Sequence, residues 1–256
     1  MQPEIHVFGL TLQTFGLSFA LAFVASGLVV GKRLSELAKP KDWAYEITLV
    51  ALIGGLIGAR GYFLIENFDQ VKDDFFGNIF SGAGLVWYGG LIGGTVAVLL
   101  WAYGRKMLNL GLLDLVAPAL ALGYAVGRVG CQLSGDGDYG KASDLPWAMA
   151  YPEGTVPTTE SVHPTPIYES LTMGLIALLL WSWRGAFRPG VLFAFYLILA
   201  GGERFLVEFV RRNEVVWAGL TVPQLESLGL ILLGAIWLLV QNRFGGLRPD
   251  SASVVS

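Results

Sequence analysis

Two arginine-containing runs suggest chemistry in this chain. Arg128 stands in GRVGCQLSGD (127–136), at the end of a long apolar stretch. An arginine at membrane depth is costly, so it persists mainly where it faces a polar cavity or a charged partner. We therefore predict that Arg128 belongs to a functional site.

The second run is GGERFLVEFVRR (201–212), which places Arg204, Glu208 and Arg211 at positions i, i+4 and i+7. That spacing predicts one helix face carrying three ionisable groups over about 10 Å. Such a stripe must face protein or water. It is either an internal Arg204–Glu208 ion pair with Arg211 at the interface, or that pair combined with an anion site.

We favour the anion site, because one carboxylate cannot neutralise two guanidiniums and Arg128 adds a third. Guanidinium groups match phosphate geometry bidentately, and they do so best in partly dry surroundings. A phospholipid headgroup is therefore the expected anion.

The turn SGDGDYG (134–140) follows Arg128 and carries Asp136 and Asp138. We expect these carboxylates to pair with the arginines or to orient a proton acceptor, and Ser134 and Gly135 to contact the substrate. Alternating Asp and Gly can indicate a calcium loop, but the further ligands of an EF-hand are absent. We therefore expect no metal site.

Four other residues have both a functional and a structural interpretation. Tyr88 belongs either to the site or to the interfacial aromatic belt. His163 could act as a base or could cap the segment that it opens. Arg60 either joins the arginine cluster or anchors its helix. Cys131 is expected to be inert packing rather than a nucleophile.

Two glycine-rich patches recur, GGLIGAR (54–60) and GGLIGG (89–94). Small residues four apart let helix backbones approach closely in lipid, and this is the favoured interpretation. Glycines at a helix entrance can also present backbone N–H groups to a phosphate. Gly89 and Gly90, directly after Tyr88, suit that role better than the first patch.

The composition predicts the elements that position these residues. Of 256 residues, 54% are hydrophobic and 14% are charged, and the mean hydropathy is +0.59. Seven apolar windows of roughly 18–22 residues fit membrane-spanning helices. We place them at 10–31, 44–65, 85–103, 112–131, 166–183, 189–210 and 222–241, which predicts an all-α polytopic membrane protein.

The distribution of basic residues predicts the orientation. The loops after the first, third and fifth spans and the tail hold Lys32, Arg33, Lys39, Lys41, Arg105, Lys106, Arg184, Arg188, Arg243 and Arg248. The opposite side holds only Lys72, Lys141, Arg211 and Arg212. The positive-inside rule then puts the amino terminus outside and the carboxyl terminus inside. Because Arg60, Arg128 and Arg204 fall near the outer ends of spans, the site is expected to open toward the outer leaflet.

Further features limit the function classes. The first apolar segment has no basic residue before it and no convincing cleavage pattern after it, so we expect a retained helix. Residues 1–256 are expected to form a single integral membrane domain, with an exported, irregular and acidic cap loop at about 134–165.

One cysteine excludes an intrachain disulfide, and a net charge of −3 argues against a nucleic-acid partner.

The motif order GARGY, WxGGLIGG, DLxAPxxxxGxxxGRxGC, HPTPIYES and RFxxEFxR resembles the bacterial prolipoprotein diacylglyceryl transferases, which are seven-helix inner-membrane enzymes. The resemblance implies transfer of the diacylglyceryl group of phosphatidylglycerol to the lipobox cysteine of a preprolipoprotein, with release of glycerol phosphate. It also implies that Arg128 and Arg204 hold the headgroup, with Glu208 and Arg211 as companions. The substrate supplies the thiol, and no cofactor is expected.

Three positions depart from the family pattern: Tyr88 stands for a common His, Cys131 for Asn and Phe15 for Tyr. The usual base candidate is therefore replaced, and Tyr88, Asp136 or His163 could take its place. Alternatively, the positive potential of the arginines deprotonates the thiol. Two other functions remain open: a divergent member acting on another lipid or acceptor, and a lipid or anion transporter.

Overall fold

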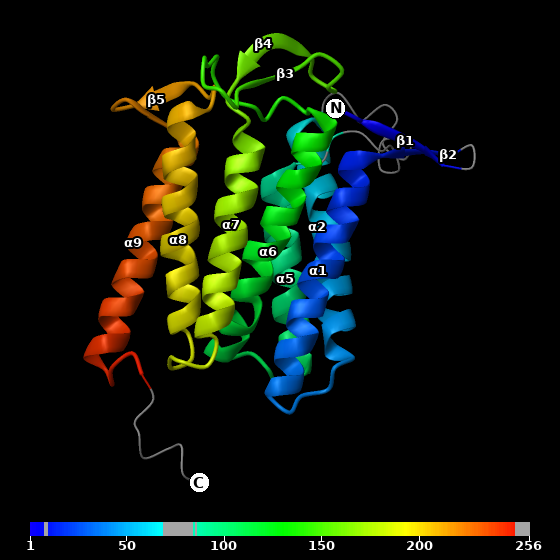
Figure 1. Ribbon diagram of the computed structural model, residues 1–256. Coiled ribbons are helices and arrows are strands. Elements are labelled where there is room, and N and C mark those ends of the chain that lie inside the picture. Colours follow the sequence, from blue (N-terminus) through cyan, green and yellow to red (C-terminus); the bar gives the residue numbers. More distant parts are fainter. Residues whose placement is uncertain (8–9, 69–83, 85, 249–256) are drawn as a thin grey trace. The chain divides into compact units, whose positions relative to one another are not determined.

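Helices dominate the computed structural model, which describes residues 1–7, 10–68, 84 and 86–248 (Figure 1). Each of the seven predicted apolar segments corresponds to one helix, although Leu10–Gln13 at the start of the first segment is a strand and Glu208–Val210 at the end of the sixth is a 3₁₀ turn. These helices are α1 (Thr14–Glu36), α2 (Trp43–Glu66), α5 (Trp87–Gly104), α6 (Leu110–Ser134), α7 (Thr165–Trp183), α8 (Val191–Val207) and α9 (Val222–Arg243). Among the described helices, α1, α2, α6 and α9 are long and apolar enough to cross a membrane. The chain is a mostly helical, multi-pass membrane protein.

The chain divides into two compact units, Met1–Val29 with Leu113–Ser256, and Val30–Leu112. In the second unit, α2 packs against α5 through the two glycine patches. A Cβ atom at Gly58 would overlap the carbonyl oxygen of Gly89 and lie 2.8 Å from the Cα of Gly93. Close helix packing, the favoured interpretation of these patches, is confirmed.

In the first unit, α6 packs on α7 through small residues. Ala121 and Ala125 of α6 share a buried cluster with Met173 and Ala177 of α7. The Ser170 hydroxyl donates to the Ala125 carbonyl at 2.9 Å. This contact fixes the register of the two helices one turn before Arg128.

Capping interactions position the ends of α8 and α9. The Asp114 carboxylate of α6 accepts the backbone N–H groups of Gly190 at 2.7 Å and Phe193 at 2.8 Å, which satisfies the start of α8. Helix α9 begins with a capping box between Thr221 and Gln224. The arginine-bearing end of α8 is therefore held beside a well-defined helix start.

Three short antiparallel hairpins complete the described part of this unit: β1 (Glu4–Val7) with β2 (Leu10–Gln13), β3 (Met149–Tyr151) with β4 (Thr158–Val162), and β5 (Val215–Trp217) with β6 (Leu220–Thr221). The β3–β4 hairpin lies over the ends of α6 and α7 (Figure 1). The prediction of an irregular loop at 134–165 is therefore wrong in part. Strand pairing satisfies the backbone there, and Tyr139 stacks on the fully buried Tyr151 with ring centroids 4.7 Å apart. Lys72 lies outside the described residues.

Candidate active site

A single carboxylate on α7 gathers the three arginines that the sequence singled out. Glu169 is fully buried. Its Oε2 lies 3.2 Å from Arg128 Nε and 3.4 Å from Arg211 Nη1. Its Oε1 lies 3.0 Å from Arg204 Nη1. The prediction that these guanidiniums converge is confirmed, and the group that joins them is Glu169.

Two further carboxylates complete the cluster. Glu208 Oε2 lies 3.0 Å from Arg204 Nη2 and 3.7 Å from Arg211 Nε, so the predicted strut exists. Asp138 pairs with Arg128 through Nη1 and with Arg211 through Nη2, the second contact at 2.5 Å. Three carboxylates therefore face three guanidiniums. The expected excess of positive charge was wrong, because Glu169 and Asp138 enter from elements that the α8 spacing does not report.

The charged stripe on α8 is also not one continuous helix face. The α-helix ends at Val207, a 3₁₀ turn follows at Glu208–Val210, and Arg211 has extended backbone. The turn folds Arg211 back toward Glu169 and Asp138. Glu208 Oε1 meanwhile accepts the Thr221 hydroxyl at 2.9 Å, which ties the end of α8 to the start of α9.

Tyr124 belongs to the cluster as well. Its hydroxyl donates to Glu169 Oε1 and accepts from Arg128 Nη2, both at 3.0 Å. The Arg128 guanidinium also lies 4.9 Å from the centroid of this ring. Sequence reasoning missed both Tyr124 and Glu169. The argument that marked Arg128, a charge inside an apolar segment, would also have marked Glu169 in HPTPIYES.

The turn after α6 brings Asp138 to the arginines. Gly135 and Gly137 have φ of +58° and +96°, a region that glycine adopts without strain. The Asp138 carbonyl accepts the Thr165 hydroxyl at 2.5 Å and Arg211 Nη1 at 3.0 Å. Burial would raise the pKa of Asp138, but the charges of Arg128 and Arg211 outweigh it and hold that pKa below its usual range.

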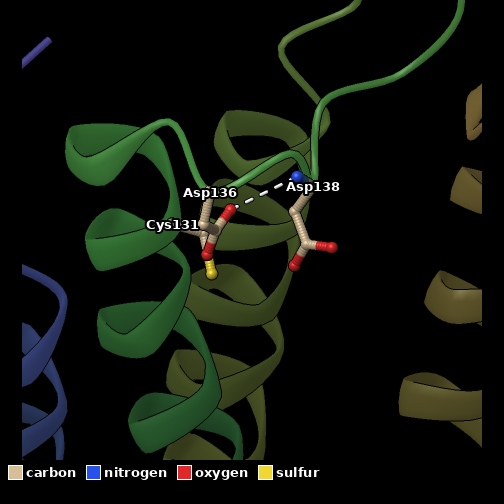
Figure 2. Close-up of side chains that lie close together, drawn as sticks. All are labelled: Cys131, Asp136 and Asp138. Carbon is tan, nitrogen blue, oxygen red and sulfur yellow. Dashed lines mark hydrogen bonds between the residues drawn. The ribbon is translucent and has the colours of Figure 1, made fainter. Parts of the chain in front are cut away.

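Asp136 has a different environment (Figure 2). Its carboxylate accepts the Asp138 backbone N–H at 3.2 Å and the Cys131 thiol. Burial raises the pKa of Asp136, and the neighbouring Asp138 charge acts in the same direction. The predicted pairing with arginines is therefore confirmed for Asp138. Asp136 instead accepts a hydrogen bond from the Cys131 thiol.

Cys131, Asp136 and Asp138 also meet the spacing of a three-ligand metal group, since their candidate ligand atoms lie within 4.8 Å of one another. The chemistry of the site opposes a cation. Asp138 is bound by two guanidiniums, and the Arg128 Nη1 lies 3.7 Å from the Cys131 sulfur. We interpret the three residues as a hydrogen-bonded turn.

Ser134 and Gly135 hold that turn against the cap. The buried Ser134 hydroxyl donates to the Cys131 carbonyl at 3.3 Å, and the Ser134 carbonyl accepts the Thr155 N–H at 2.8 Å. The Gly135 carbonyl accepts the Val156 N–H at 2.9 Å. Both residues have these structural contacts, and their contact with substrate stays a prediction.

His163 lies in a cavity of about 440 Å³ rather than among the arginines. Its Nδ1 is 3.3 Å from the Tyr168 hydroxyl, which also accepts the Trp147 indole N–H at 2.7 Å. The buried Glu203 of α8 lines the same cavity. This carboxylate was not identified from the sequence.

The remaining candidates belong to the second unit. Tyr88, at the start of α5, is 44% exposed and contacts Trp87 edge to face at 5.2 Å. Arg60 is buried, donates to the Gly84 carbonyl at 3.1 Å and lies 5.0 Å from the Phe63 ring centroid. Gly89 packs on Gly58, and Gly90 donates its N–H to Val86. Their contribution to the arginine site stays a prediction.

Comparison with known proteins extends over nearly the whole chain. Residues 3–240 match the model of a family described as prolipoprotein diacylglyceryl transferase. A Clostridium tetani protein named phosphatidylglycerol–prolipoprotein diacylglyceryl transferase is 33% identical over 250 residues, covering 95% of this chain and 99% of its own. A Methylococcus capsulatus protein of that name is 32% identical over 255 residues, covering 93% and 94%. One from Leptospira interrogans is 28% identical over 279 residues, covering 88% of each chain.

Proposed function

This chain belongs to the prolipoprotein diacylglyceryl transferase family, and from that premise we propose that it moves the diacylglyceryl group of phosphatidylglycerol to the lipobox cysteine thiol of a preprolipoprotein. Glycerol phosphate is the leaving group. The observation that carries the proposal is the convergence of Arg128, Arg204 and Arg211 on Glu169, in a chain that matches the family from residue 3 to residue 240.

The membrane arrangement that we propose has seven spans, with the amino terminus outside and the carboxyl terminus inside. The basic residues of the loops support this orientation by the positive-inside rule. The chain then forms one integral domain in the bacterial inner membrane, with residues 134–165 as an exported cap. The arginine cluster stands at the outer ends of α6, α7 and α8 in this topology, within reach of outer-leaflet lipid.

The proposed role of the arginines is to bind the phosphate and to stabilise the charge that grows on it as the carbon–oxygen bond breaks. Each guanidinium is already paired, so the phosphate must share or replace a carboxylate. Asp138 suits this exchange, because its side chain is 34% exposed whereas those of Glu169 and Glu208 are fully buried. Asp138 thus holds two guanidiniums in place until an anion arrives.

The nucleophile in this proposal is the substrate thiol, so the enzyme needs no cysteine of its own. Arg60, Gly89 and Gly90 remain proposed headgroup contacts from the second unit. Tyr88, Asp136 and His163 remain proposed acceptors of the thiol proton. Among these, Asp136 is already hydrogen-bonded to a thiol, that of Cys131.

The decisive experiment incubates the purified full chain with phosphatidylglycerol and a lipobox peptide and measures the peptide mass. We expect the mass increment of one diacylglyceryl group, and none when the peptide cysteine is replaced by serine. A folded preparation that leaves the peptide unmodified contradicts the proposal. Modification with another phospholipid but not with phosphatidylglycerol would indicate a divergent substrate, and lipid flux without covalent product would indicate a transporter.

A further inference from the structure

A cavity of about 440 Å³ lies between α7 and α8, beneath the loop that carries Trp147. Apolar side chains line much of it, including Leu206 and Val207 from α8, Val210 from the 3₁₀ turn that follows, and Leu145 from the loop. The cavity can therefore hold an apolar group. Of the roles proposed above, only that of His163 as a proton acceptor involves a residue of this cavity.

Glu203 is the unusual group in this cavity. It is only 7% exposed, and no group among the described residues donates a hydrogen bond to it, although the charges of Arg204, Arg128 and Arg211 act on it from a distance. Burying a carboxyl group without a partner is costly, so such a group is expected to receive a donor from a ligand.

The cavity borders the arginine cluster because the same two helices build both. On α8, Glu203 faces the cavity while the next residue, Arg204, binds Glu169 and Glu208. On α7, Tyr168 faces the cavity while the next residue, Glu169, holds the three arginines. A group in the cavity would lie beside a lipid headgroup at the arginines.

We propose that this cavity receives the acceptor cysteine with its flanking apolar residues, and that Glu203 takes the proton of the acceptor thiol. This inference rests on the proposed function, and it assigns a binding site to the second substrate of that reaction, the preprolipoprotein. A lipid acyl chain offers no donor to the buried carboxyl group, and a second phosphate would be repelled by it. An apolar peptide segment brings both apolar side chains and an S–H donor.

The step balances without another reactant. The thiol proton passes to a Glu203 oxygen while the sulfur forms a bond to the terminal glyceryl carbon of the lipid. The bond between that carbon and the phosphate oxygen breaks, and its electron pair leaves with the phosphate beside the guanidiniums. Glu203 then releases the proton to water.

The charged and titratable groups around Glu203 come from several elements: Tyr124 and Arg128 of α6, Tyr168 and Glu169 of α7, Arg204 of α8, Arg211 after α8, and His163 of the loop. The test therefore replaces Glu203 alone. In the peptide transfer assay we expect Glu203→Gln to lower kcat at pH 7 by about 100-fold or more, the range of general-base catalysis. We expect binding of the Cys→Ser peptide to remain within about threefold, because the apolar walls are unchanged.

The pH profile separates proton transfer from a structural role. The Glu203→Gln rate should rise about tenfold per pH unit toward the thiol pKa of about 8.5, because solvent then removes the proton. The matched control is Glu214→Gln, which removes an exposed carboxyl group and should keep the wild-type profile. A Glu203→Gln enzyme as active as wild type at every pH overturns the assignment.

A second variant tests the cavity if Glu203→Gln fails to fold. Leu206 is 68% exposed at the cavity wall, so Leu206→Trp should fold and fill the space. We expect the KM for the peptide to rise about tenfold or more, with the KM for phosphatidylglycerol unchanged. An unchanged peptide KM overturns the cavity assignment. A wild-type protein that produces no thioether contradicts the proposed function instead.

Discussion

The guanidinium Nε of Arg128 lies 3.2 Å from the Oε2 of Glu169, a carboxylate with no exposed surface on the neighbouring helix. Two more arginines bind the same carboxylate. Glu169 is therefore the structural centre of the site. It positions the guanidiniums, and it does so in a place where water cannot substitute for it.

Replacing Glu169 by Gln should remove the one carboxylate that pairs with all three arginines of the cluster, whose side chains are buried or half-buried. Breaking a buried ion pair from one side costs about 3–5 kcal/mol, so the free energy of unfolding should fall by a similar amount. We also expect transfer activity to be lost. Thermal unfolding of the detergent-solubilised protein measures the first effect, with Glu214→Gln as the control. A variant of wild-type stability would contradict the central role of Glu169.

Replacing Arg128 or Arg204 by Lys keeps the charge but removes the fork that binds a carboxylate and a phosphate together. We expect each Lys variant to lose at least about 100-fold in transfer and each Ala variant to be inactive. All four should still insert, because seven apolar segments remain. Arg243→Lys, a change in the last turn of α9, serves as the control. Full activity in Arg128→Lys would contradict phosphate recognition by the fork.

The helices could be predicted because each is a long apolar run, and hydropathy reports such runs directly. The pairing of Arg204 with Glu208 could be predicted because sequence spacing reports groups on one helix face, whereas Arg211 joins them through a 3₁₀ turn that the helical spacing did not predict. The pairing of Asp138 with the arginines was predicted from its place in the turn after Arg128, but Glu169 was not placed, because it reaches Arg204 and Arg211 from another helix, α7. The net charge of the arginine cluster depends on carboxylates that are distant in the sequence. The prediction that the cluster has an excess of positive charge was therefore wrong.

The structure of the cap loop (134–165) could also be predicted only in part from the sequence. Its prolines and acidic residues indicated an irregular loop, yet Tyr139, Tyr151 and Val162 form a small buried cluster around the β3–β4 hairpin. Short strands that gain their stability from a few aromatic contacts leave only a weak pattern in the sequence. Glu203 was missed because its neighbour Arg204 gave the stronger charge pattern.

Replacing Cys131 by Ser should leave transfer within about threefold of wild type. The serine hydroxyl can still donate to Asp136, and the proposed nucleophile is the substrate thiol. The peptide transfer assay checks this, with Cys131→Ala separating the hydrogen bond from the volume. An inactive but folded Cys131→Ser protein would require a covalent intermediate on the enzyme and would contradict the proposed mechanism.

Asp138 should make the fold acid-sensitive. Its pKa is lower in the folded protein than the usual value of about 3.9, so the folded state favours the ionised form. That stabilisation is fully present above pH about 4 and is lost as the pH falls through the lower folded-state pKa. Thermal unfolding of wild type and Asp138→Asn between pH 2 and 7 should converge at the acid end. A constant difference in unfolding temperature over this range would show that Asp138 does not contribute through its charge.

The contact between α2 and α5 should tolerate a methyl group at one glycine and reject it at another. A Cβ atom at Gly58 meets the Gly89 carbonyl and the Gly93 backbone, which cannot move aside as a side chain can. At Gly61, less than one turn later on α2, a Cβ atom meets nothing within 4 Å. Gly58→Ala should therefore lower the unfolding temperature, whereas Gly61→Ala should keep or raise it, since alanine favours the helix by up to about 1 kcal/mol. Equal effects of the two substitutions would contradict the backbone contact between these helices.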